Sequence, residues 1–104
     1  MEIQIHWANG IDASDALSAH VRAQVEHALR HVPNQFTRVD VHLHDDNASK
    51  GGVDDKRCVI EARPTSARPL TVEGIGGDFY PTVSAAGKKL ERVVQDFADK
   101  RRGH

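Results

Sequence analysis

The sequence predicts an α+β fold: a two-layer β-α-β-β-β-α sandwich, with a four-stranded mixed sheet and both helices on one face. Three observations predict it. Periodic segments follow one another in that order, each strand segment alternates apolar and polar residues, and each helical segment carries one apolar stripe. Alternating strands have only one apolar face to cover, so both helices must lie on the same side of the sheet. We expect residues 1–104 to form one domain.

The first strand and the first helix come from the opening third of the chain. A strand is expected over residues 2–8, where apolar side chains alternate with polar ones. Ser14 is a suitable N-cap for the helix, and Pro33-Asn34 should end that helix soon after His31. Its apolar stripe consists of Leu17, Val21, Val25 and Ala28. A right-handed crossover through this helix makes the first two strands parallel.

Three further strands are expected to pair as antiparallel neighbours, because the links between them are short. Their apolar positions are Val39, Val41 and Leu43, then Cys58, Ile60 and Ala62, then Leu70 and Val72. Pro64 ends the third strand, and the glycines at 74, 76 and 77 should release the fourth into the last helix. Residues 45–55 are acidic and rich in glycine, which predicts a loop. Cys58 alternates with apolar residues and should be buried.

The last helix is expected over residues 78–102, with Asp78 capping its first turn. Its apolar stripe consists of Val83, Ala86, Gly87, Leu90, Val94 and Phe97. At 100° per residue, Lys88 and Arg92 point away from this stripe and Lys89 lies on its flank. The helix therefore has a core side and a basic side.

Composition limits the possible functions. With 14 Lys and Arg against 15 Asp and Glu, the formal net charge is −1, so a nucleic-acid role must depend on local clusters of cations. One cysteine, no membrane-length apolar run and no signal-peptide pattern predict a cytoplasmic protein. Neither a glycine-rich phosphate loop nor a nucleophile elbow nor a metalloprotease motif is present, so we expect no enzyme and no cofactor.

Six of the seven histidines form two groups. One group, on the polar face of the sheet, consists of His6, His42 and His44, and the other, along one flank of the first helix, consists of His20, His27 and His31. The spacing of His27 and His31 can hold a divalent metal, but no further protein ligand is evident and we expect no metal site. A second interpretation is a response to pH, since protonating all seven changes the formal charge from −1 to +6. RNA affinity would then rise between about pH 7.5 and about pH 6.

Several local strings resemble one known family. They include SDAL at residues 14–17, VDVHL at 39–43, and the last-helix pattern D-x-Y followed by K-L-x-R. The residues that match this last pattern are Asp78, Tyr80, Val83, Lys89, Leu90, Glu91 and Arg92. Together with the order of elements, they make nearly the whole chain similar to the ribosome hibernation-promoting factor family, in its short form. That family includes ribosome-associated inhibitor A and the sigma-54 modulation proteins.

The resemblance implies a role without catalysis. Such a protein occupies the decoding channel of the small ribosomal subunit and silences translation, with basic side chains against ribosomal RNA phosphates. It implies no membrane and no small-molecule substrate. Lys89 and Arg92 carry over from the family pattern, while helical geometry adds Lys88, Arg22 and Arg30. The alternative is a non-catalytic protein-interaction module of the same fold with weak or no RNA binding. The near-neutral charge and the acidic pairs at 45–46 and 54–55 favour that alternative.

Overall fold

The computed structural model describes residues 1–46 and 55–103, with side chains through Arg101. Its elements, in chain order, are β1 (Glu2–Trp7), α1 (Asp15–Ala28), β2 (Phe36–Asp45), β3 (Lys56–Pro64), β4 (Leu70–Gly76) and α2 (Phe79–Gly103). This order confirms the predicted β-α-β-β-β-α succession. Most of the loop expected over 45–55 lies outside the described residues.

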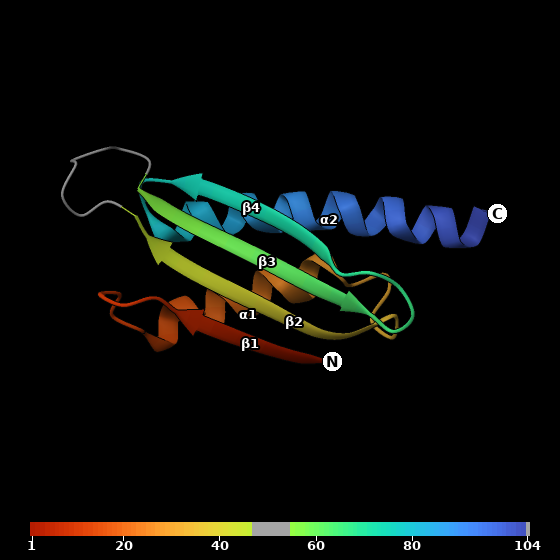
Figure 1. The fold of residues 1–104 in the computed structure, drawn as a ribbon, viewed down its shortest axis with the longest axis horizontal. Coiled ribbons are helices and arrows are strands. Elements are labelled where there is room, and N and C mark those ends of the chain that lie inside the picture. Colours follow the sequence, from red (N-terminus) through yellow and green to blue (C-terminus); the bar gives the residue numbers. More distant parts are fainter. Residues whose placement is uncertain (47–54, 104) are drawn as a thin grey trace.

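The four strands form one sheet in the order β1-β2-β3-β4. β1 pairs with β2 in parallel, whereas β2 with β3 and β3 with β4 are antiparallel, as predicted. In the register, Val41 lies opposite both Ile5 and Ile60, so apolar side chains align across neighbouring strands. Both helices lie on the same face of the sheet (Figure 1), which leaves the other face open. The predicted two-layer sandwich is confirmed.

The core fills the space between the sheet and the helices. Fully buried side chains come from both layers and include Val21, Val25, Val39, Val41, Ile60, Val83 and Leu90. Cys58 is also fully buried among them, and this burial raises the pKa of its thiol to about 12. The thiol therefore behaves as a small apolar group, as the alternation predicted.

The helix starts follow the predicted caps. Ser14 Oγ accepts a hydrogen bond from the Leu17 amide at 3.1 Å, and Asp78 Oδ1 accepts one from the Tyr80 amide at 3.3 Å. The end of α1 differs, because the helix stops at Ala28 rather than after His31. Leu29 and Val32 are buried, and the Val32 amide donates to the Leu29 carbonyl at 3.0 Å. The chain thus turns back into the core before the proline is reached.

Gly74 lies inside β4, whereas the sequence predicted that it would help to end this strand. The strand does not end at Gly74 but continues through it to Gly76. A Cβ at Gly74 would lie 2.6 Å from the Thr82 carbonyl oxygen and 2.9 Å from the Ala86 amide nitrogen. Gly74 therefore marks the place where α2 rests directly on the backbone of β4.

Candidate nucleic-acid interface

The lysines and arginines of the strands are all paired with carboxylates in the described part of the chain. Arg57 Nε lies 2.8 Å from an Asp46 oxygen, and Lys56 Nζ lies 3.1 Å from Asp45 and 3.0 Å from Asp55. The acidic residues expected to repel RNA beside the 45–55 loop are thus largely neutralised by β3, apart from position 54, which lies outside the described residues. This end of the sheet is balanced in charge.

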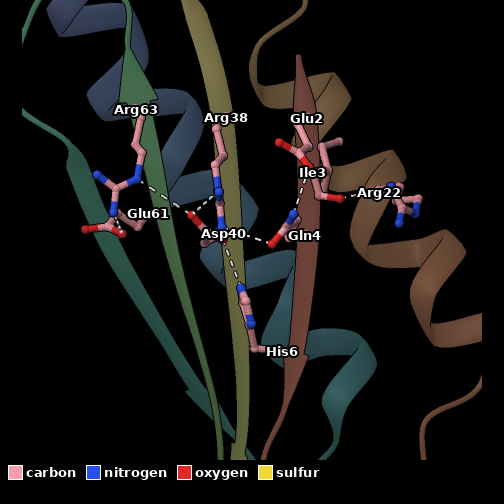
Figure 2. Close-up of polar contacts among 9 residues, drawn as sticks. All are labelled: Glu2, Ile3, Gln4, His6, Arg22, Arg38, Asp40, Glu61 and Arg63. Atoms are coloured by element: carbon pink, nitrogen blue, oxygen red, sulfur yellow. Dashed lines mark hydrogen bonds and ion pairs between the residues drawn. The ribbon is translucent and has the colours of Figure 1, made fainter.

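A second cluster of paired charges surrounds Asp40 on the open face of the sheet (Figure 2). Arg38 donates to both carboxylate oxygens at 3.0 Å, His6 Nε2 lies 2.9 Å from Oδ1, and Arg63 Nε lies 3.7 Å from Oδ2. Asp40 is only 4% exposed although it faces away from the core. Its pKa falls to about 2, mainly because Arg38 donates hydrogen bonds to it. Arg63 also pairs with Glu61 at 2.9 Å, so both arginines of the cluster are compensated.

Two of the predicted sheet-face histidines stack on each other. The rings of His6 and His42 lie 4.5 Å apart at 13°. The pKa of His42 is lowered, first by its partial burial and then by the charge of His6. These side chains therefore belong to a packed polar layer over the sheet. The response of RNA affinity to pH stays a prediction.

The cations of α2 are arranged differently from those of the sheet. Lys88 and Arg92 are exposed, and neither has a hydrogen bond or ion pair with any residue that the structure describes. Lys89 is exposed as well and donates from Nζ to the main-chain carbonyl of Glu73 at 2.7 Å, not to a carboxylate. We call Lys88, Lys89 and Arg92 the α2 cation group. Its three charges have no carboxylate partner among the described residues.

The structure does not bring the two predicted arginines of the first helix into this group. Arg22 lies on the flank of α1 that faces β1, where Nη1 donates to the Ile3 carbonyl at 3.3 Å (Figure 2). Arg30 lies just beyond the end of α1 and forms an ion pair with Glu91 at 2.8 Å. Its Nη1 also donates to the His27 carbonyl at 2.7 Å. A role for either arginine in RNA binding stays a prediction.

A groove that the sequence did not predict runs between the two helices beside Lys88. Its volume is about 430 Å³, and its lining residues are Ala23, Gln24, His27, Gly87, Lys88 and Glu91. Helix contact is close here, since a Cβ at Gly87 would lie 2.9 Å from Gln24 Oε1. Nearby, His20 Nε2 lies 3.1 Å from the Tyr80 carbonyl and 3.0 Å from Ser84 Oγ, so this histidine joins the helices. Helix packing creates the groove, and no local sequence signal indicates it.

Residues 1–46 and 55–103 also contain the histidines that suggested a metal site. In these ranges no three His, Cys, Asp or Glu side chains are grouped to hold a metal ion. His27 lies in α1 but His31 lies beyond its end, so the two histidines do not share the helical spacing that suggested a ligand pair. No helix among the described residues has the length and apolar character needed to cross a membrane.

Fold and surface together define a small two-layer α+β protein whose described strand cations are paired with carboxylates, whereas the α2 cation group has no carboxylate partner among the described residues. The chain belongs to the Sigma 54 modulation protein / S30EA ribosomal protein family, whose model matches residues 3–102. No curated protein sequence matches the chain.

Two solved structures have the same fold. A ribosomal subunit interface protein from Coxiella burnetii superposes with a TM-score of 0.78 at 19% sequence identity. The match covers 94% of this chain and 98% of the Coxiella chain. The N-terminal domain of Thermus thermophilus Protein Y superposes with a TM-score of 0.73 at 22% sequence identity. The match covers 93% of this chain and 99% of the Thermus chain. At these identities the likeness concerns the fold.

Proposed function

We propose that this protein is a ribosome-associated, translation-silencing (hibernation) factor of the cytoplasm that binds the decoding channel of the small ribosomal subunit through the α2 cation group. Family membership supports a ribosomal partner. So does the likeness to a structure described as a ribosomal subunit interface protein. One observation about this chain carries the choice of surface. Its described strand cations are all paired with carboxylates, whereas Lys88, Lys89 and Arg92 are not.

The proposed interaction is electrostatic. A side-chain cation that meets an RNA phosphate releases a condensed counterion, so affinity falls as the salt concentration rises. Unpaired cations suit this role, because no internal ion pair has to be broken before a phosphate is bound. The silencing role requires only that the protein occupy the channel, so no reaction is proposed.

The test compares wild type with the variant Lys88→Glu, Lys89→Glu, Arg92→Glu. Each protein is mixed with purified small ribosomal subunits and sedimented through a sucrose gradient at several salt concentrations. We expect wild type to sediment with the subunits at low salt and the triple variant to stay at the top. In wild type, these three phosphate contacts should contribute roughly −2 to the slope of log affinity against log salt.

A charge-matched pair of double variants separates a specific surface from a general loss of positive charge. The first double variant carries Lys88→Glu and Arg92→Glu. The second carries Arg68→Glu and Lys100→Glu, which alter two other exposed cations. Only the first pair should abolish co-sedimentation. Equal losses in both would refute the assignment to α2. Wild type that fails to sediment with subunits even at low salt would refute the proposed function and favour the protein-interaction module.

A further inference from the structure

The ion pair between Arg30 and Glu91 lies beside the groove between α1 and α2. The guanidinium of Arg30 is held on two sides, by Glu91 at 2.8 Å and by the His27 carbonyl at 2.7 Å. Both partners of the ion pair are partly exposed, each with 39% of its side-chain surface accessible. The pair therefore joins the end of α1 to the middle of α2 at the surface.

Glu91 is the one carboxylate among the residues that line the groove. Left alone, it would repel a phosphate that approached Lys88, which lines the same groove. The pKa of Glu91 is lowered, first by its hydrogen bond with Arg30 and further by the nearby His27 and His31. The carboxylate is thus ionised, and Arg30 is the side chain that compensates it.

We propose that the groove holds a phosphodiester group of an RNA strand on Lys88, and that Arg30 neutralises Glu91 instead of contacting the RNA. This inference rests on the function proposed above, whose surface includes Lys88. The occupant follows from charge complementarity, since neutralising Glu91 leaves the positive charge of Lys88 uncompensated among the residues that line the groove. Arg30 is then a positioning residue.

The competing role for Arg30 is direct contact with a phosphate. In the structure its guanidinium already donates to a carboxylate and to a main-chain carbonyl, so it would have to leave both partners to bind RNA. Lys88 has no such partner among the described residues and can reach a phosphate freely. The two roles predict different couplings between Arg30 and Glu91, which a double-mutant cycle measures.

The cycle consists of wild type, Arg30→Gln, Glu91→Gln and the double variant. Affinity is measured at fixed ionic strength for two probes, purified small ribosomal subunits and a fluorescein-labelled single-stranded RNA. We expect Arg30→Gln to weaken binding roughly three- to tenfold, the effect of one uncompensated charge within several ångströms of a phosphate. Glu91→Gln should bind at least as well as wild type, and Arg30→Gln should have little effect in that background.

Two further variants locate the phosphate. Lys88→Gln should weaken binding to both probes, whereas Lys100→Gln, on the same helix but outside the groove, should not. Circular dichroism and thermal melting show whether each variant remains folded.

Each contrary result identifies which proposal is wrong. If Arg30→Gln weakens binding equally in the wild-type and Glu91→Gln backgrounds, Arg30 contacts RNA and the inference is overturned. If Arg30→Gln does not weaken binding in either background, the inference is overturned as well. Full binding by Lys88→Gln would overturn it as well. If wild type binds the RNA but not the subunits, the proposed function is wrong and the cycle on the RNA still decides the inference. Failure to bind either probe would overturn both.

Discussion

Replacing Asp40 by Asn tests whether the polar network on the open sheet face stabilises the fold. The carboxylate accepts hydrogen bonds from Arg38 at 3.0 Å and lies 2.9 Å from His6 Nε2. Asparagine keeps the shape but removes the charge. The pKa of Asp40 falls from 3.8 to about 2, which corresponds to about 2 kcal/mol before solvent screening. Because this face is open to solvent, we expect Asp40→Asn to lower the free energy of unfolding by roughly 1 kcal/mol near neutral pH.

The sign of the pH dependence follows from the direction of the shift. A carboxyl group whose pKa is lower in the folded state stabilises that state above its unfolded pKa of 3.8, and this contribution disappears as the pH falls toward 2. The stability difference between wild type and Asp40→Asn should therefore be constant from about pH 5 upward and shrink below about pH 4.

Urea unfolding followed by the fluorescence of Trp7, the single tryptophan, measures this difference at each pH. Glu61→Gln serves as a control, because Glu61 forms a more exposed ion pair and its loss should change stability by less than about 0.5 kcal/mol. A difference for Asp40→Asn that is the same at pH 2.5 as at pH 7, or absent at pH 7, would refute the reasoning.

Two further predictions concern the packing of the core. Gly74→Ala should lower the free energy of unfolding by about 3 kcal/mol, because the added Cβ meets backbone atoms of Thr82 and Ala86 that cannot move independently. Gly87→Ala should cost less than about 1 kcal/mol, since its Cβ meets the flexible end of Gln24; equal costs in urea unfolding would contradict this account. The Cys58 thiol, fully buried and with a pKa of about 12, should resist a thiol reagent at pH 8 in the native state and react fully in urea. Rapid reaction of the native protein would show that the thiol is accessible.

The parts of the fold that follow a local period could be predicted from the sequence. Val41 and Ile60 alternate with polar neighbours because only one face of each strand is covered, so a period of two residues identifies their direction. The caps at Ser14 and Asp78 were also predictable, because a cap accepts hydrogen bonds from amides only two or three residues away in the sequence. The exposure of Lys88 and Arg92 likewise follows from helical spacing.

Contacts between distant segments could not be predicted in this way. The ion pair of Arg30 with Glu91 depends on how α1 and α2 cross, and neither residue carries a local signal for it. The alternation of residues 39–43 puts Asp40 opposite the apolar face, but its burial requires the cross-strand register that brings Arg63 beside Arg38. Gly74 looked like a strand terminator because sequence alone does not show that a helix rests on it.

On each of the two outer strands, β1 and β4, a main-chain carbonyl accepts a hydrogen bond from a cationic side chain of a helix. Arg22 of α1 donates to the Ile3 carbonyl on β1, and Lys89 of α2 donates to the Glu73 carbonyl on β4. An exposed sheet edge can recruit a strand from another molecule, and charged side chains are a common defence against such pairing. Each helix thus places a cation on one border of the sheet. An incoming strand would have to displace it, so pairing between the sheet edges of two molecules is disfavoured at these two positions.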